Sequence, residues 1–445
     1  MIPGLAAALL PPAPLHLQLY HILANSWLCE VYFLCKSDQL NERPVTTMNE
    51  KKKIILGISG GISAYKSVYI ASGLKKKGYD VRVIMTDGAT KFVTPLTFET
   101  MSGNKVVTDV FDPANETPTE HITLGQSSDL ALIAPATGNV IAKLAHGIAD
   151  DMLTTTMLAC TCPVLISPAM NTVMFENPAT QANLDILRER GYTIIEPAEG
   201  MLACGVEGKG KMPEPDVLID YVEQWVSKEK DMAGLKVLVT AGPTQEAIDP
   251  VRYITNHSSG KMGYAIAHMA ARRGAEVTLV SGRTALPQER FVETVDVLSA
   301  QDMFDAVTSR APEMDIIIKA AAVADYRPAE VATEKIKKSD AAAGRSVELE
   351  PTQDILGYLG THRKEGQFLC GFAMETQNLL ENAAAKLVKK NVNMICANSL
   401  KTKGAGFQGD TNVITILTKK GMKQLPLLSK LEAADAILDE IMALR

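Results

Sequence analysis

The chain has 445 residues, which is enough for two or three domains that each bury a full core. Its formal charge is -6, from 45 basic and 51 acidic residues, and this mildly acidic balance gives no electrostatic case for binding nucleic acid. The 7 cysteines are an odd set without C-x-x-C spacing, which argues against disulfides and a zinc site and favours a reduced, cytoplasmic location.

Residues 1–50 differ in composition from the rest of the chain. No Lys or Arg precedes Lys36, so the basic start of a secretory signal is missing, and early prolines would break a membrane helix. We therefore expect no membrane span here. The segment would be either a disordered leader or a stretch upstream of the true translation start at Met48. The alternative is a weak membrane or partner contact through residues 15–34.

Residues 52–67 predict a buried strand, a glycine turn and the start of a helix. The strict dinucleotide pattern G-x-G-x-x-G fails, because Ser59 and Ile62 stand at glycine positions. Small residues still allow a phosphate to approach the backbone, and serine hydroxyls can donate to it. The candidate contacts in this turn are Gly57, Ser59, Gly60, Gly61 and Ser63.

Three further strands end in turns that suit a flat cofactor. The strand at residues 80–86 lacks the mid-strand acid that usually binds an NAD ribose, which favours a mononucleotide such as FMN. Strands at 129–137 and 163–171 also end in turns that contain proline and polar residues. Since the carboxyl ends of parallel strands meet at one edge of a sheet, these turns would surround the cofactor. The added candidates are Thr86, Ala134, Thr137 and Asn139.

Residues 196–215 are rich in glycine and proline and have little periodicity, which predicts a mobile loop of lid length. Cys204 lies in this flap. Most free cysteines are inert buried thiols, but a residue in a glycine-rich flap is expected to be poorly buried, which favours a catalytic role for Cys204. The amphipathic stretch that follows ends in a charge run, so we place a domain boundary there and expect domains at 51–230 and 231–445.

The second domain opens with a strand at residues 236–244 and has a helix at 264–274. Between them, residues 249–263 (DPVRYITNHSSGKMG) predict an anion-binding loop at a helix N-terminus. A P-loop would need Gly and Ser or Thr where the chain has Thr255 and Met262, and the compact dinucleotide turn is absent. The pattern favours a nucleoside triphosphate, and the alternative is a polar surface loop.

Lysines are concentrated in two later segments. Residues 327–345 begin beside Asp325 at the end of a predicted strand, so Lys335 or its neighbours could fold over a triphosphate. A solvated surface segment is the alternative. A predicted helix then presents Lys386 and Lys390 on one face, four residues apart.

From about residue 51 to the C-terminus, the chain resembles the bifunctional coenzyme A biosynthesis enzymes, in which a phosphopantothenoylcysteine decarboxylase is fused to a phosphopantothenate–cysteine ligase. The shared motifs are GISGGISAYK, HITLG, PAMN, ACG, AGPT, DPVRYITNHSSGKMG, AAVADY, EKIKK and GFAMET. The resemblance implies an α/β protein with two three-layer, doubly wound domains. The first would be a flavodoxin-like flavoprotein domain, and the second a Rossmann-like domain that binds CTP.

For the first domain, the resemblance implies an FMN-dependent decarboxylase that assembles into trimers or a dodecamer. FMN would oxidise the cysteine end of the substrate to a thioaldehyde, which eases loss of carbon dioxide. His121 matches the family's base, Asn171 its carboxylate-binding amide and Cys204 its proton donor. Histidine titrates near neutrality, so the first assignment is also chemically reasonable.

For the second domain, the resemblance implies a dimeric ligase that joins L-cysteine to 4′-phosphopantothenate through an acyl-cytidylate. Mg²⁺ would neutralise the triphosphate of CTP, and its protein ligands stay unassigned. Asn256 would act on the acyl-cytidylate and Lys335 would close over the site. The expected CTP contacts are Asp325, Lys335, Gln353, Asp354, Ile355, Leu356, Phe372, Lys386 and Lys390.

Two rival functions predict other residues. A flavoprotein fused to a nicotinamide-dependent reductase would need G-x-G-x-x-G after Val239, where the chain has GPTQE. A regulatory flavin-binding subunit with dead active sites would be expected to have lost His121, Cys204 or Lys335, and all three are present.

Overall fold

The computed structural model describes residues 51–201, 205, 207–226, 229–337, 346–375, 379–399 and 409–445. They form two compact units, which are described separately below. The expected leader, residues 1–50, lies outside the described residues. In the described part of the chain, no helix combines the length and the apolar character that a membrane span requires.

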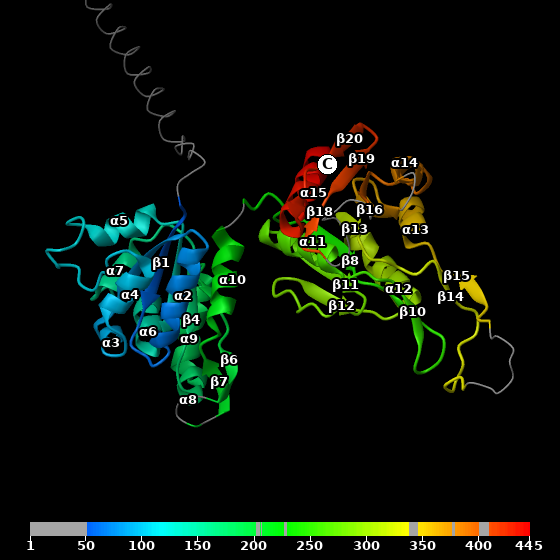
Figure 1. Cartoon of the computed structure of the whole chain (residues 1–445). Coiled ribbons are helices and arrows are strands. Elements are labelled where there is room, and N and C mark those ends of the chain that lie inside the picture. The colour runs from blue at the N-terminus through cyan, green and yellow to red at the C-terminus, as the bar shows by residue number, and fades with distance from the viewer. Residues whose placement is uncertain are drawn as a thin grey trace, which may run out of the picture. The chain divides into compact units, whose positions relative to one another are not determined.

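The first unit is built on a sheet that contains β1 and β4 (Figure 1), and its described strands follow the order β2-β1-β3-β4-β5. Strand β1 pairs in parallel with both β2 and β3. Its strands are continuous apolar runs because both faces are covered, and Leu132 and Ile133 are fully buried. This order is that of a flavodoxin-like sheet. The strands are β1 (Lys53–Ile58), β2 (Asp80–Met85), β3 (Leu130–Ala136), β4 (Val164–Pro168) and β5 (Thr193–Ile194).

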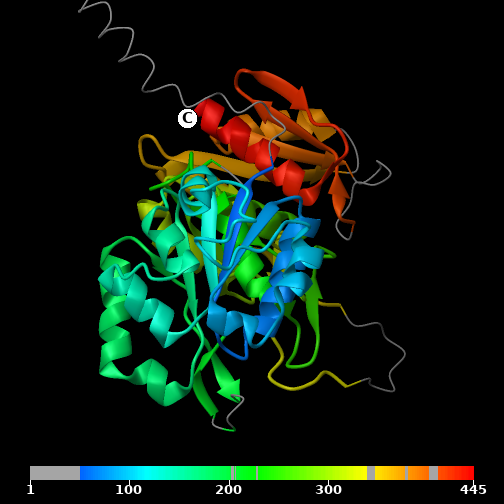
Figure 2. The same cartoon turned by 90° about the vertical axis from the view of Figure 1, so that its left-hand side faces the viewer.

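Helices lie on both sides of this sheet (Figure 2). Helix α2 packs against α4, and α6 packs against both α7 and α9. The helices are α2 (Ala64–Lys76), α3 (Asp87–Thr90), α4 (Pro95–Ser102), α5 (Glu120–Ser127), α6 (Gly138–His146), α7 (Met152–Leu158), α8 (Thr172–Glu176) and α9 (Pro178–Glu189). Helix α10 (Pro215–Val226) comes later in the chain and contacts α11 (Lys261–Arg272). The flap predicted as a loop contains two paired strands, β6 (Ala198–Met201) and β7 (Glu207–Lys211).

The second unit has a larger sheet, with the described order β12-β11-β8-β13-β16-β17-β19-β20. The strands from β12 to β17 are parallel, and β19 and β20 are antiparallel. The parallel part has the strand order of a Rossmann-like sheet. Its strands are β8 (Lys236–Ala241), β11 (Glu276–Ser281), β12 (Glu293–Asp296), β13 (Ile316–Lys319), β16 (Phe368–Glu375), β17 (Met394–Ser399), β19 (Ile414–Thr418) and β20 (Gly421–Gln424).

Two apolar layers enclose this sheet. One includes side chains of α11 (Lys261–Arg272) and α15 (Lys430–Leu444), and the other includes those of α12 (Ala300–Arg310) and α13 (Ile355–His362). Helix α14 (Leu379–Lys389) also contributes to the second layer. The α/β class and the two doubly wound sheets predicted from the sequence are therefore confirmed.

The second unit also contains several short elements outside its main sheet. The expected anion loop contains a hairpin, because β9 and β10 pair antiparallel between the end of β8 and the start of α11. The remaining elements are β9 (Gln245–Ala247), β10 (Tyr253–Thr255), η1 (Ala311–Glu313), β14 (Tyr326–Pro328), β15 (Leu349–Pro351), β18 (Thr411–Asn412) and β21 (Leu428–Ser429).

Candidate active sites

The glycine turn after β1 is joined to the turn after β3 by the buried hydroxyl of Ser59. This hydroxyl donates to the carbonyl of Pro135 at 2.7 Å and accepts from the amide of Thr137 at 2.9 Å. The expectation that it donates to a phosphate is therefore corrected, because its donor is engaged within the protein. Ser59 instead holds together two turns that were predicted to share one ligand.

Backbone and helix geometry at these turns suits an anion. A Cβ added at Gly60 would lie 2.7 Å from the backbone carbon of Gly88, so the turn after β1 approaches the segment after Thr86 closely. Thr137 caps α6, whose first-turn amides face the same turns. The structure thus brings the FMN candidates Gly57, Ser59, Gly60, Gly61, Thr86, Ala134, Thr137 and Asn139 to the carboxyl ends of β1, β2 and β3.

The Pro-Ala-Met-Asn turn after β4 joins this cluster. The amide of Ala169 donates to the carbonyl of Ala136 at 3.0 Å, which connects it to the turn after β3. Asn171 caps α8, and its Oδ1 accepts from the amide of Val173 at 2.9 Å. This bond orients the side chain so that Nδ2 is the end that can donate to a carboxylate.

The flap packs directly on the same turn. The amide of Met170 donates to the carbonyl of Gly210 in β7 at 3.1 Å. A Cβ at Gly210 would lie 2.3 Å from the carbonyl oxygen of Met170, so only glycine fits this approach. Cys204, the expected proton donor, lies outside the described residues.

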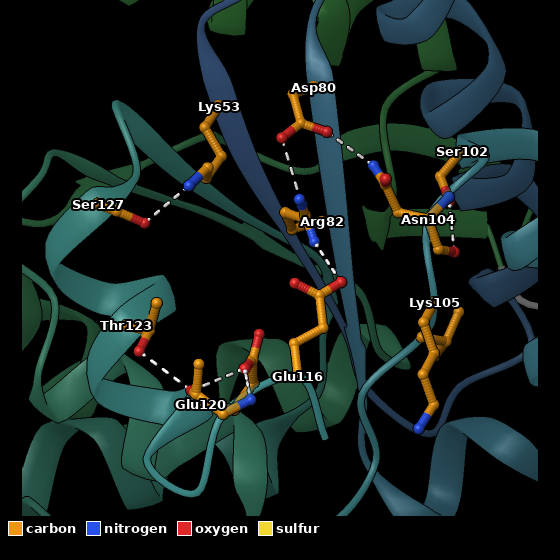
Figure 3. Close-up of polar contacts among 12 residues, drawn as sticks. Lys53, Asp80, Arg82, Ser102, Asn104, Lys105, Glu116, Glu120, Thr123 and Ser127 are labelled. Carbon is orange, nitrogen blue, oxygen red and sulfur yellow. Dashed lines mark hydrogen bonds and ion pairs between the residues drawn. The ribbon is translucent and has the colours of Figure 1, made fainter. Parts of the chain in front are cut away.

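His121 lies in the first turn of α5, and a polar network fixes the segment that carries it. Arg82 of β2 donates to Glu116 at 3.0 Å, and Figure 3 marks this contact. Beside His121, Glu120 is buried and accepts from both the amide and the hydroxyl of Thr117 at 2.9 Å. Nδ1 of His121 is buried and has no hydrogen-bond partner among the described residues. A buried ring nitrogen without a partner suits proton transfer with a ligand.

The second unit contains a cavity of about 430 Å³ at the carboxyl ends of its central strands. Four of the candidate ligase residues line it: Asn256, which was expected to act on the acyl-cytidylate, and Asp325, Phe372 and Lys386, which were expected to contact CTP. The other lining residues are Ser258, Ser259, Gly260, Lys261, Met262, Gly263, Lys319, Ala320, Ala321, Ala322, Val323, Ala373, Met374, Asn398, Asn412 and Lys430. Four lysines beside one aspartate make this lining strongly basic, which suits a polyphosphate.

Glycines allow the anion loop to pack closely at the wall of this cavity. Gly260 caps α11 with φ 78°, a left-handed conformation that favours glycine. A Cβ at Gly263 would lie 2.6 Å from the Cβ of Ala241, so helix α11 packs directly on β8. Asn256 donates from Nδ2 to the carbonyl of Ala322 at 3.3 Å. The side chain of Asn256 is therefore anchored between the hairpin and the turn after β13.

Lys319, at the end of β13, was not predicted from the sequence. Its pKa is lowered to about 8, mainly by burial and next by the positive charge of Lys386. The carboxylates of Asp354 and Asp325 oppose this shift, and Lys390 adds to it. The charges that act on Lys319 therefore belong to residues that are expected to bind CTP. The sequence feature that could have identified it is a lysine within an otherwise apolar run (DIIIKAAAVADY).

The other expected CTP contacts are not among the residues that line the cavity. Asp354 caps α13 by accepting from the amide of Gly357 at 3.0 Å, and it forms an ion pair with Lys390. Ile355 and Leu356 are buried, so only their backbone groups can meet a ligand. Gln353 precedes this cap. The side chain of Lys335 is exposed and does not belong to the cavity lining.

Asn398 is a second residue that sequence reasoning missed. It is 4% exposed, lines the cavity, and its Oδ1 has no hydrogen-bond partner among the described residues. An unpartnered buried carbonyl oxygen is costly unless a ligand donor meets it. In the described residues, no group of three or more His, Cys, Asp or Glu side chains is arranged to hold a metal ion.

Two family models match successive parts of the chain. The Flavoprotein family model matches residues 42–227, and the model described as DNA/pantothenate metabolism flavoprotein C-terminal domain matches residues 232–444. Among solved structures, the C-terminal domain of a coenzyme A biosynthesis bifunctional protein CoaBC is 47% identical, with a TM-score of 0.41, and covers 48% of this chain and 97% of its own. The FMN-binding protein AtHal3 is 32% identical, with a TM-score of 0.37, over 40% of this chain and 99% of its own.

Curated relatives match nearly the whole chain. The coenzyme A biosynthesis bifunctional protein CoaBC of Bacillus subtilis (strain 168) is 48% identical over 401 residues, which cover 89% of this chain and 98% of the relative. The protein of the same name from Escherichia coli (strain K12) is 44% identical over 391 residues, which cover 88% and 96%. At this identity and coverage, the chain belongs to the family of coenzyme A biosynthesis bifunctional proteins CoaBC.

Proposed function

We propose that the two units perform consecutive reactions of coenzyme A biosynthesis. The second unit uses CTP to ligate L-cysteine to 4′-phosphopantothenate, and the first unit uses FMN to decarboxylate the product to 4′-phosphopantetheine. Family membership supports this pair of activities. The observation that carries the ligase assignment is the lysine-lined cavity beside Asn256, because CTP and 4′-phosphopantothenate are both anionic.

The turns of the first unit fit FMN. The close approach of Gly60 to Gly88 and the first turn of α6 would hold its phosphate. The buried hydroxyl of Ser167, at the end of β4, has no hydrogen-bond partner among the described residues and would meet a polar group of the cofactor. When bound, FMN would supply the oxidation of the substrate's cysteine end and the return of the electrons.

Protein groups would bind the substrate and move protons around the cofactor. The amide of Asn171 would hold the substrate carboxylate without the full opposing charge of an arginine, so that carbon dioxide can leave. His121 would accept a proton through its buried ring nitrogen. Cys204 would return a proton to the product, and docking of β7 on the Asn171 turn supports a flap that covers the substrate.

In the ligase reaction, the cavity lysines would neutralise the phosphates of CTP. The carboxylate of 4′-phosphopantothenate attacks the α-phosphorus of CTP and releases pyrophosphate, and the amine of cysteine then displaces CMP. Asn256 would hold the acyl-cytidylate, and Lys335 would approach from its exposed segment when CTP is bound. Mg²⁺ would bind mainly to phosphate oxygens, consistent with the lack of a protein carboxylate cluster among the described residues.

We further propose a cytoplasmic homo-oligomer, with trimeric or dodecameric decarboxylase units and dimeric ligase units. Large apolar side chains exposed on the first unit support self-association, since Phe111 is 89% exposed and Leu96 is 68% exposed.

The function is tested by incubating the purified protein with 4′-phosphopantothenate, L-cysteine, CTP and Mg²⁺ and following the products by mass. Formation of 4′-phosphopantetheine and CMP is expected. The variant Cys204→Ser should form 4′-phosphopantothenoylcysteine and CMP but not 4′-phosphopantetheine. If a flavin-loaded preparation forms neither product, the proposal is wrong, and if Cys204→Ser also stops ligation, the assignment of activities to the two units is wrong.

A further inference from the structure

Cys160 and Cys162 form a close pair of thiols at the end of the sheet opposite the ligand-binding turns. They follow α7 and precede β4, whose other end leads to Asn171. Their Sγ atoms are 3.2 Å apart, and both residues are partly exposed. Neither belongs to the two sites described above.

The backbone around this pair is held against α5. The amide of Thr161 donates to the carbonyl of Gly125 at 3.1 Å. A Cβ at Gly125 would lie 3.0 Å from the backbone of Ala159, which leaves no room between the two segments. The spacing of the two sulfur atoms is therefore set by the tertiary structure and not only by the C-x-C sequence.

We propose that Cys160 and Cys162 form a thiol–disulfide exchange site, which low-molecular-weight disulfides oxidise reversibly to an intramolecular disulfide.

The two sulfur atoms have different reactivity. The hydrogen bond from Cys162 is the main cause that lowers the pKa of Cys160 to about 7, so a large fraction of this thiol is ionised near neutral pH. The same pairing raises the pKa of Cys162, as do burial and the carboxylate of Asp129. Asp129 is itself paired with Lys52 at 2.9 Å. Cys160 is therefore the attacking sulfur and Cys162 the resolving one.

The exchange is balanced as two successive displacements. The Cys160 thiolate attacks one sulfur of the external disulfide, whose S–S bond breaks to release one thiolate and leave a mixed disulfide on Cys160. Cys162 then loses its proton to solvent and attacks Cys160 Sγ, which releases the second thiolate. The two protein thiols lose two electrons, and the external disulfide gains them. The main cause of the raised pKa of Cys162 disappears once Cys160 carries the mixed disulfide.

A metal ion fits this pair less well. Thiolates on a tetrahedral zinc ion, with bonds of about 2.3 Å, lie about 3.8 Å apart. The described residues also offer no third or fourth ligand grouped with the pair. A disulfide needs the sulfur atoms at about 2.05 Å, which the observed 3.2 Å reaches by a small movement of two side chains.

The chain contains a matched internal control. Cys370 and Cys396, on neighbouring strands β16 and β17, have sulfur atoms 3.8 Å apart but are 0% exposed. Burial should prevent an external disulfide from reaching this second pair in the folded protein. In chain unfolded by guanidinium, the thiols of both pairs should react similarly with an alkylating reagent.

The test exposes the native full chain to glutathione disulfide and glutathione in defined ratios, followed by acid quenching, alkylation and tryptic mapping. Residues 144–188 form one tryptic peptide that contains both Cys160 and Cys162. Under oxidising ratios, we expect this peptide to lose two hydrogen atoms and escape alkylation, while the peptides with Cys370 and Cys396 stay alkylated. Added dithiothreitol should restore both thiols.

Variants separate the two displacements. Cys162→Ser should accumulate a glutathione adduct on Cys160, and Cys160→Ser should react at least tenfold more slowly at pH 7. In the unmodified protein, the oxidation rate should fall about tenfold per pH unit below 7 and level off above it, because the thiolate is the nucleophile. Retention of both thiols in glutathione disulfide without added glutathione would overturn the proposal, as would equally rapid oxidation of the buried pair.

Discussion

The carboxylate of Asp249 accepts a hydrogen bond from the backbone amide of Ile336 at 3.1 Å. Arg252 completes the connection, since its guanidinium pairs with Asp249 and donates to the carbonyl of Ile336 at 2.9 Å. Asp249 is 2% exposed, and the hydrogen bond from Arg252 is the main cause that holds its pKa well below the usual range. The ion pair between Asp249 and Arg252 thus fixes Ile336, the residue next to Lys335.

We expect Asp249→Asn to reduce the ligase rate by about tenfold to a hundredfold, because small displacements of a catalytic group cause losses of that size. The substitution removes the charge that orients Arg252 and weakens the hold on Ile336. Release of CMP from CTP in the presence of both other substrates measures the effect.

Asp302→Asn is the matched control, because Asp302 completes the capping box of α12 with Ser299 in the same unit but does not line the cavity. Decarboxylation of 4′-phosphopantothenoylcysteine should be unchanged in both variants. Equal ligase rates for Asp249→Asn and the unmodified protein would show that this connection does not position Lys335.

Lys319 makes CTP binding dependent on pH. Its pKa of about 8 is lowered from the usual value, mainly by burial, so its charge is present below pH 8 and is lost as the pH rises through 8. Lysines with ordinary pKa values, near 10.4, keep their charge over this range. The KM for CTP should therefore rise between pH 7 and pH 9, as measured by initial rates of CMP release.

Lys319→Met should raise the KM for CTP at pH 7 and remove the step near pH 8. Lys236→Met serves as the control, because Lys236 lies at the opposite end of β8 and pairs with Glu313 at 3.7 Å. Persistence of the same pH step in Lys319→Met would assign it to another group.

Gly210→Ala should lower the decarboxylation rate at least tenfold and leave ligation intact. The added Cβ would lie 2.3 Å from the carbonyl of Met170, so β7 must move away from the turn that carries Asn171. Gly200 provides a matched control, because its φ of 143° is nearly that of Gly210, at 142°, but nothing lies within 4 Å of its added Cβ. Equal decarboxylation rates in the two alanine variants would contradict the proposed role of flap docking.

Ser59→Ala should lower both the stability of the first unit and its retention of FMN. Removing the hydroxyl leaves the buried carbonyl of Pro135 and the amide of Thr137 without this partner, which costs about 1–3 kcal/mol of unfolding free energy. Flavin absorbance per protein after gel filtration and thermal unfolding measure the two effects. Ser102→Ala is the control, since the buried hydroxyl of Ser102 donates to the carbonyl of Asn104 at 3.2 Å and Ser102 is not an expected FMN contact. Similar flavin loss in both variants would contradict the role of Ser59.

The sequence predicted the elements that depend on local pattern. Continuous apolar runs identified the buried parallel strands, and the turns that follow them identified the ligand edge, because parallel strands bring their carboxyl ends together. Thr137 was proposed as a ligand contact in this way, whereas the role of Asn256 was inferred from the family resemblance. The two hairpins were missed, because β6, β7, β9 and β10 are short and lack the alternation that marks longer strands.

By itself, the sequence determined the α/β class and the two successive doubly wound units, since these follow from periodicity and from motifs along the chain. It also supplied the candidate residues around the expected ligands, which remain predictions. Only the tertiary structure decided that the pKa of Lys319 is lowered and that Asp249 accepts a hydrogen bond from the amide of Ile336. It also decided that Cys160 faces Cys162 rather than solvent alone. Burial, charge pairing and sulfur spacing depend on side chains from separate segments, and folding alone brings these segments together.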